Sequence, residues 1–145
     1  MGSVTGAVDL AGREWLEYDY GSGLMATEQP AALPMWRYRE LLPLADGPVR
    51  YPLPIGGTPL PAPGRRQELR APRLWIKDET RSPTASNRDR ASALVIEDGL
   101  RRGVDTITTA STGNAVVSTA FGAAAAGIQD VIFVSADCQP ESLRS

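Results

Sequence analysis

The chain has 145 residues, with 15 lysine and arginine side chains against 17 aspartate and glutamate, which gives a net charge of −2. That length is one ordinary domain able to bury a core, and the near-balanced charge argues against a nucleic-acid partner and a polybasic membrane contact. Histidine is absent, which excludes Ser-His-Asp and Cys-His nucleophiles and histidine-containing metal sites, while the single Cys138 excludes an internal disulfide; we predict no metal site.

The prolines divide the chain into two parts. Eleven of the 12 prolines lie between Pro30 and Pro83, and none lies between Thr84 and Gln139. Because proline removes a backbone donor and fixes φ, the first part can hold little regular structure. We therefore predict an irregular N-terminal arm over residues 1–72, with short pieces of helix and strand such as a helical turn at 35–42. A partial α/β domain is predicted over 73–145.

The second part alternates between strand and helix patterns. Ser86 and Asp89 fit a capping box that begins a helix, and Gly103 and Gly127 are typical helix ends. The apolar run Asp130–Ser135 predicts a fully buried parallel strand. The fold class is therefore α/β, an open parallel sheet built from βαβ units. Strands are predicted at 73–77, 105–110 and 130–135, helices at 86–102 and 115–126, and a further helix after Pro140.

The turn Ser111-Thr112-Gly113-Asn114 is the first candidate for chemistry, because it follows a predicted strand and begins a helix. Ligands of open α/β sheets bind at the carboxyl ends of strands, and a helix start offers free N–H groups to a carboxylate or phosphate. Gly113 allows the backbone to approach such a ligand. Taken alone, this short motif favours simple helix capping over a ligand site.

Two further segments carry weaker signals. Residues 86–90 place Arg88 and Arg90 at a helix start, which fits either a cationic site or a solvated, capped helix. The glycine pair of Gly56-Gly57-Thr58-Pro59-Leu60 fits an ordinary turn. Each segment by itself favours the structural interpretation.

The order of these segments is more specific than any one of them. In chain order they are WRYRELLP (36–43), GGTPL (56–60), LWIKDETRSPTASNRDR (74–90), ASTGN (110–114) and VIFVSAD (131–137). Together they resemble the threonine synthases, a family within the fold-type-II pyridoxal-phosphate-dependent enzymes, the tryptophan synthase β-like group. The resemblance runs from about residue 14 to the C-terminus, and its first two segments favour threonine synthases over threonine dehydratases or cysteine synthases. The resemblance implies a truncated fold-type-II fold and pyridoxal phosphate as the cofactor.

The resemblance also implies roles for single residues. In the family, a segment like Pro-Thr-Gly-Ser-Phe-Lys-Asp-Arg holds the lysine that forms a Schiff base with the cofactor; here it reads Pro-Thr-Ala-Ser-Asn-Arg-Asp-Arg over residues 83–90, with Arg88 at the lysine position. Asn114 matches the asparagine that binds the cofactor ring hydroxyl. Ser111, Thr112 and Gly113 match the loop that holds the substrate carboxylate.

Arg88 is a chemical departure from the family. A Schiff base needs a neutral amine, whereas arginine stays protonated at physiological pH and is a poor nucleophile. The only lysine, Lys77, lies eleven positions earlier. We also expect the glycine-rich loop that holds the cofactor phosphate in the family to be missing, because it would follow Ser145. Binding of pyridoxal phosphate is therefore doubtful.

We predict a threonine-synthase-like protein that has lost Schiff-base catalysis and retains a site for a small anion or amino-acid carboxylate at Ser111–Asn114. The family reaction is that of a lyase converting O-phosphohomoserine to threonine; whether this chain is an enzyme stays open. The alternative is an interaction module that self-associates or completes a split pyridoxal-phosphate-dependent lyase with another chain, and a decayed fragment remains a further interpretation. Without an apolar run of about 18 residues or a visible leader, we expect a cytoplasmic protein.

Overall fold

The computed structural model describes residues 3–8, 14–19 and 35–136, and the chain divides into two compact units, residues 1–48 and 49–145. In the first unit, β1 (Ser3–Val8) pairs with β2 (Glu14–Asp19) in antiparallel register, from Ser3 opposite Asp19 to Val8 opposite Glu14. The helical turn predicted at 35–42 is confirmed as a 3₁₀ helix, Trp36–Leu41. Leu42 is extended, as the following proline requires.

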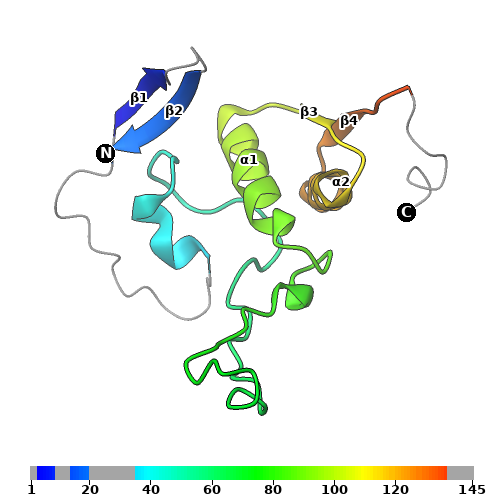
Figure 1. The fold of residues 1–145 in the computed structure, drawn as a ribbon. Helices are drawn as coiled ribbons and strands as arrows, with labels where there is room; N and C mark the ends of the chain where they lie inside the picture. The colour runs from blue at the N-terminus through cyan, green and yellow to red at the C-terminus, as the bar shows by residue number, and fades with distance from the viewer. Residues whose placement is uncertain (1–2, 9–13, 20–34, 137–145) are drawn as a thin grey trace. The chain divides into compact units, whose positions relative to one another are not determined.

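In the described part of the second unit, a 3₁₀ helix, η2 (Glu79–Arg81), precedes two α-helices. These are α1 (Arg88–Arg102) and α2 (Asn114–Ala126), which pack against each other (Figure 1). Both end as predicted. Gly103 and Gly127 adopt left-handed φ values of 72° and 71°, and their N–H groups bond back to carbonyls of the last helical turn.

Two parallel strands flank α2 in the sequence. β3 (Thr106–Ala110) and β4 (Gln129–Phe133) pair in register, from Thr106 opposite Gln129 to Ala110 opposite Phe133, and α2 packs against both. Strand, helix and parallel strand form one βαβ unit, which confirms the predicted α/β class with a parallel sheet. The helix predicted after Pro140 lies outside the described residues.

The strand predicted at 73–77 is wrong, because that segment is irregular. It lies beside a segment containing Pro59, Pro61 and Pro63, which have no N–H to donate. Hydrogen bonds therefore run in one direction, from Ile76 N to the Pro61 oxygen and from Asp78 N to the Pro59 oxygen, each 3.0 Å long. Proline removes the reciprocal bonds that a sheet ladder needs.

The burial predicted for the last strand is also wrong. Val131 is 44% exposed and Phe133 is 60% exposed. The prediction assumed that both faces of β4 would be covered, as in a complete parallel sheet. Within the described residues, β4 pairs with β3 alone, so one of its edges and much of its surface remain open.

The capping box predicted from Ser86 and Asp89 forms differently. The cap position is Asn87, and the Ser86 hydroxyl accepts a hydrogen bond from Arg88 N at 3.2 Å. The Asp89 carboxylate turns to Thr84, accepting from its backbone N–H at 2.7 Å and from its hydroxyl. Ala85 causes the difference, because its φ of 56° brings Thr84 back over the first turn of α1.

A buried carboxylate attaches the segment before Ile55 to α1. Glu97 is fully buried, and one of its oxygens accepts from the backbone N–H groups of Arg50 at 2.8 Å and Tyr51 at 2.7 Å. Its other oxygen accepts from the Arg101 guanidinium at 2.6 Å. Ile55 and Ile96 are both fully buried in this core. These donors offset the cost of removing the Glu97 carboxylate from water, so the carboxylate stabilises the contact between the two segments.

A chain of hydroxyl groups connects α1 to α2. The Ser118 hydroxyl donates to Ser92 at 2.8 Å, Ser92 lies 3.1 Å from the Thr119 hydroxyl, and Thr119 donates to the Ala115 carbonyl at 2.7 Å. Each hydroxyl therefore has a partner in the buried interface. Ser92 and Ser118 each lie one turn into their helices, so the first turns of α1 and α2 lie at the same end of the pair.

Candidate functional site

The carboxyl ends of β3 and β4 border an open hollow of about 480 Å³. This is the edge of a parallel sheet where ligands bind in α/β proteins. Three hydroxyl side chains and three apolar residues line the hollow. Its lining residues are Ala110, Ser111, Thr112, Phe133, Val134 and Ser135.

The turn between β3 and α2 borders this hollow through two of its predicted site residues. The Ser111 hydroxyl accepts a hydrogen bond from Gly113 N at 3.3 Å, which shapes the turn without capping the helix. Thr112, Gly113 and Asn114 are exposed. Within the described part of the chain, the N–H groups of Asn114 and Ala115 have no protein acceptor. Two free donors and the positive end of the α2 dipole can accept a small anion here.

The first turn of α1 differs from that of α2, because its backbone N–H groups already donate hydrogen bonds to neighbouring residues of the chain. Arg88 N donates to the Ser86 hydroxyl, Asp89 N to the Ser86 carbonyl at 3.3 Å, and Arg90 N to the Asn87 carbonyl at 3.2 Å. No donor of this turn is left for an anion. The capping interpretation of residues 86–90 is therefore the better one for the backbone.

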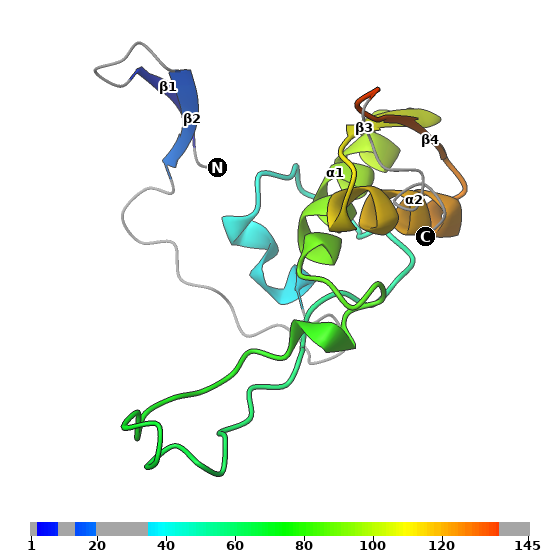
Figure 2. The same ribbon diagram turned by 45° about the vertical axis from the view of Figure 1, so that its right-hand side comes forward.

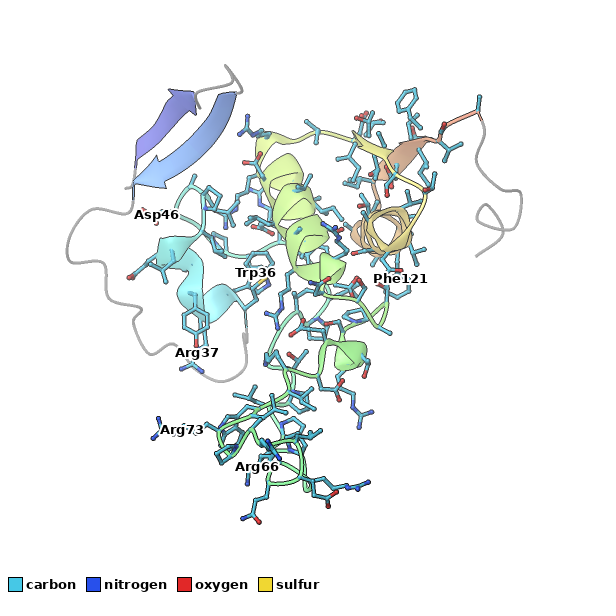
Figure 3. All side chains as sticks on the ribbon, viewed as in Figure 1. Trp36, Arg37, Asp46, Arg66, Arg73 and Phe121 are labelled. Carbon is cyan, nitrogen blue, oxygen red and sulfur yellow. The ribbon has the colours of Figure 1, made fainter. Side chains whose placement is uncertain are left out.

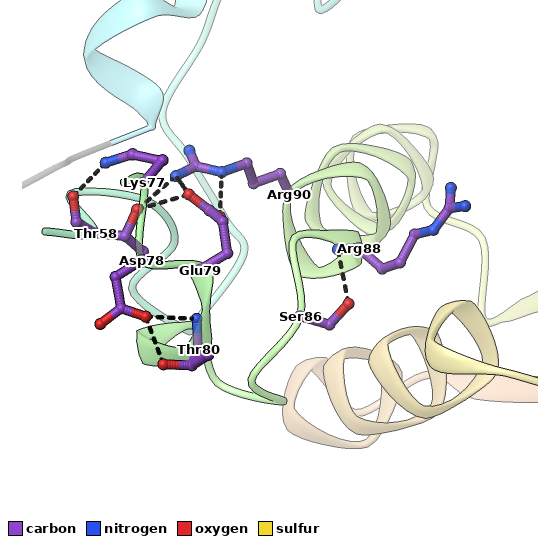
Figure 4. Close-up of polar contacts among 8 residues, drawn as sticks. All are labelled: Thr58, Lys77, Asp78, Glu79, Thr80, Ser86, Arg88 and Arg90. Carbon is purple, nitrogen blue, oxygen red and sulfur yellow. Dashed lines mark hydrogen bonds and ion pairs between the residues drawn. The ribbon is translucent and has the colours of Figure 1, made fainter. Parts of the chain in front are cut away.

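Arg88 and Arg90 leave this turn in different directions, as Figure 4 shows. The Arg90 side chain extends toward Thr58 and Glu79, whereas Arg88 extends away from both. Arg88 is exposed, and in the described residues its guanidinium has neither an ion pair nor a hydrogen bond. It is available to a ligand, although no contact joins it to Asn114.

Arg90 belongs to a polar cluster that the sequence did not predict. Its guanidinium binds both oxygens of Glu79, each at 2.8 Å, and also reaches the Thr58 hydroxyl at 3.1 Å. Thr58 donates to Glu79 at 2.7 Å, and the Lys77 ammonium donates to the Thr58 carbonyl. The cluster therefore connects the glycine turn, residues 77–79 and α1. The opposite charges at positions 79 and 90 are visible in the sequence, but a loop containing Pro83 separates them, so no continuous helix or strand brings them together.

The charges of this cluster perturb one another. The two hydrogen bonds from Arg90 are the main reason that the pKa of Glu79 falls to about 2; partial burial opposes them, and Thr58 and the charge of Lys77 add to the effect. The same pair raises the pKa of Arg90. Both side chains stay charged across the physiological range, so the cluster holds the chain in place rather than exchanging protons.

The described residues contain neither a cluster of three or more histidine, cysteine, aspartate or glutamate side chains suited to a metal ion, nor a helix long and apolar enough to cross a membrane.

Comparisons with known proteins agree with the resemblance in the sequence. The family described as "Pyridoxal-phosphate dependent enzyme" matches residues 51–145. The threonine synthase of Methanosarcina acetivorans is 35% identical over 125 residues, which cover 82% of this chain and 30% of that protein. That of Mycobacterium leprae is 37% identical over 108 residues, covering 74% and 30%. The chain thus spans about 30% of the length of these curated relatives.

Proposed function

Because this chain belongs to the pyridoxal-phosphate-dependent enzyme family, with similarity to threonine synthases, we propose that it is a non-catalytic member that binds a small anion. The anion, such as an amino-acid carboxylate, would lie at Ser111–Asn114. The observation that carries this proposal is Arg88, which occupies the family's Schiff-base lysine position with a side chain that cannot become a neutral amine.

The donor set does not fit the family cofactor. Pyridoxal phosphate is an aldehyde that its enzymes hold covalently through an amine. Lys77 is the only lysine, and its ammonium donates to the Thr58 carbonyl, within the cluster from which Arg88 turns away (Figure 4). The side chains around the hollow are hydroxyl or apolar. Among the described residues, no amine therefore lines the hollow beside the turn that would bind a substrate.

The turn before α2 supports anion binding on separate grounds. The free N–H groups of Asn114 and Ala115 begin a 13-residue helix, whose dipole favours negative charge at that end. The hollow beside it is open to solvent and carries the hydroxyl groups of Ser111, Thr112 and Ser135. Hydroxyl and amide donors suit a carboxylate or a phosphate, and none of the described residues that line the hollow carries a carboxylate.

A borohydride trapping experiment tests the cofactor part of the proposal. The chain is mixed with pyridoxal phosphate, reduced, digested and mapped by mass spectrometry, with Lys77→Arg and Arg88→Lys as comparison variants. We expect no adduct at position 77 or 88 of the unmodified chain. A pyridoxyl group on Lys77 that disappears in Lys77→Arg would overturn this part of the proposal. An adduct that forms only at position 88 of Arg88→Lys would show that the arginine is the reason why the unmodified chain forms no Schiff base.

Amide NMR tests the anion site. Inorganic phosphate and L-alanine are titrated at low salt, and we expect saturable shifts centred on Gly113, Asn114 and Ala115. Asn114→Asp keeps the shape but adds a negative charge, so we expect it to abolish these shifts. Asn87→Asp is the matched control, because the N–H groups of the α1 start already have acceptors. Shifts spread over the whole chain, or lost equally in both variants, would contradict the site.

The exposed sheet favours a second candidate function, completion of the fold by another chain. Ile132 is 39% exposed, Phe133 60% and, on α2, Phe121 49%. In the described residues the outer edge of β4 has no strand partner. An open edge beside apolar side chains is a template for strand addition. We propose as occupant a separate polypeptide that supplies further parallel strands.

Co-expression with the chain encoded by the neighbouring reading frame tests this second candidate. We expect a complex that persists in 500 mM salt, because buried apolar surface is insensitive to screening. Phe133→Ser should weaken it, and Phe133→Leu should not. A chain that purifies without its neighbour at both low and high salt would contradict the candidate.

A further inference from the structure

Residues 59–77, here called the basic lobe, project from the helical part of their unit and return to it (Figure 2). Two 3.0 Å backbone hydrogen bonds join the two sides of its base, from Asp78 to Pro59 and from Ile76 to Pro61. The Lys77 ammonium donates to the Thr58 carbonyl beside them. The base of the lobe is therefore fixed to the cluster around Glu79.

The tip of the lobe has turns of its own. Leu69 N donates to the Arg65 carbonyl at 3.2 Å and Ala71 N to the Arg66 carbonyl at 3.0 Å. The Arg66 guanidinium lies 5.7 Å from the centre of the Trp75 ring and reaches the Pro72 carbonyl at 3.4 Å. These contacts give the lobe a defined surface, which lowers the entropy lost on docking.

The lobe concentrates positive charge in a chain that is acidic overall. It holds five cationic side chains against the single carboxylate Glu68, a net charge of +4, so the remainder of the chain carries −6. Residues 1–48 account for −4 of this, with seven carboxylates and three arginines. Within the described residues, Arg70 and Arg73 have no carboxylate partner, and Figure 3 shows Arg73 extending outward.

Large apolar side chains lie among these charges. Leu69 is 61% exposed, Trp75 56%, Leu60 54% and Ile76 50%. Arginine and tryptophan are the residues that most often dominate protein interfaces, with aliphatic neighbours excluding water. Nucleic acids stack on flat rings and give aliphatic side chains no comparable role, so the composition favours a protein surface.

We propose that the basic lobe docks onto an acidic surface of a second copy of this chain. The charge complementarity between the lobe and the remainder of the chain selects this occupant, and the exposed apolar side chains supply the buried centre. Such a contact joins two different surfaces, so it is head-to-tail and can extend beyond a dimer. It is independent of the anion site and of strand addition at β4.

Sedimentation equilibrium of the full chain tests the proposal. At 50 mM NaCl we expect a weight-average mass that rises with concentration above the 15.5 kDa of one copy. At 500 mM NaCl it should return to one copy, because salt screens exposed charges. Arg73→Glu should weaken association about tenfold, while the matched charge reversal Arg102→Glu, on exposed α1 surface, should have little effect.

Three results would overturn the proposal. A single copy at 50 mM salt excludes self-docking. Association that persists at 500 mM salt and disappears in Phe133→Ser assigns self-association to the apolar sheet instead. Sedimentation of the chain with phosphatidylserine vesicles, lost in Arg73→Glu but not in Arg102→Glu, assigns the lobe to an anionic membrane. Circular dichroism of each variant confirms that the exposed substitutions leave the fold intact.

Discussion

Ala85 has a left-handed backbone conformation, φ 56°, at the position where the family segment has glycine. A side chain in this region costs about 1 kcal/mol, which glycine does not incur. The conformation is kept because it brings Thr84 onto the Asp89 carboxylate. The strain is therefore offset by a buried, doubly hydrogen-bonded carboxylate.

Ala85→Gly should consequently be tolerated or stabilising, by up to about 1 kcal/mol, because relief of strain opposes the greater entropy of the unfolded chain. The matched control is Ala91→Gly on the exposed face of α1, which should destabilise by about 1 kcal/mol because glycine is a poor helix former. Urea unfolding measures both. An equal loss in the two variants would contradict a left-handed Ala85.

Glu79 makes stability depend on pH in the acid range. Its pKa falls from 4.5 to about 2 in the folded chain, chiefly through Arg90, so the folded state binds its proton less readily than the unfolded state. The stabilisation is complete above about pH 5 and is lost as the pH falls toward 2. We expect a loss of about 1 kcal/mol, since Arg90 is about one-third exposed and solvent screens the pair.

Unfolding free energies between pH 2 and 6 check this expectation. Glu79→Gln should be less stable than the unmodified chain at pH 6, and the difference should shrink toward pH 2. Asp98→Asn, which removes a partly exposed carboxylate paired with Arg102, is the control and should change the profile little. If the unfolding free energies of the unmodified chain and of Glu79→Gln change with pH in parallel, the ion pair between Glu79 and Arg90 contributes nothing to stability.

At the scale of elements, the close approach of α1 and α2 depends on Gly122. A Cβ atom there would lie 2.7 Å from the Tyr51 hydroxyl and 2.8 Å from Cδ1 of Ile96. Both neighbours are buried, and neither is the free end of a flexible surface side chain. Glycine is needed here for the space it leaves and not for its backbone freedom.

Gly122→Ala should therefore destabilise by about 1–3 kcal/mol, despite the better helix propensity of alanine, because the helices must move apart. Thermal unfolding measures the loss. Adding Tyr51→Phe and Ile96→Val removes the two clashing atoms, so the triple variant should recover part of it relative to the double variant Tyr51→Phe/Ile96→Val. Gly122→Ala as stable as the unmodified chain would contradict the packing described.

At the scale of the whole molecule, apolar surface is distributed unevenly over the strand pair. Ile107 of β3 is 9% exposed, whereas Phe133 of β4 is 60% exposed. Ile107 lies near Gly99 of α1, where a Cβ atom would be 3.7 Å from its Cγ2, whereas the Phe133 ring is open to solvent. Two side chains of one small sheet thus differ in what they contribute to folding.

Phe133→Ser should change the free energy of unfolding by less than about 0.5 kcal/mol and reduce the binding of an apolar dye, because an exposed ring leaves no cavity. Ile107→Ser, its buried counterpart, should cost about 3 kcal/mol, since it creates a cavity and buries a hydroxyl. Urea titration with dye fluorescence measures both. Similar losses in the two variants would show that Phe133 is covered.

The sequence by itself determined the two helices and their glycine ends, because helical spacing and a terminal glycine are local properties of a few neighbouring residues. It also determined the strands on either side of α2, from their short β-branched and apolar runs, but not the burial of β4. It also identified the family and Arg88 at the lysine position, since the chemistry of a side chain needs no coordinates.

Only the tertiary structure decided which partners the polar residues take. Asp89 binds Thr84 rather than closing a capping box, and Arg90 binds Glu79 across eleven residues, because both contacts depend on how loops fold back. The prolines opposite residues 73–77 prevented the strand that the apolar residues of this segment predicted. The exposure of β4 depends on which elements pack against it, and the sequence of a strand does not specify which elements those are.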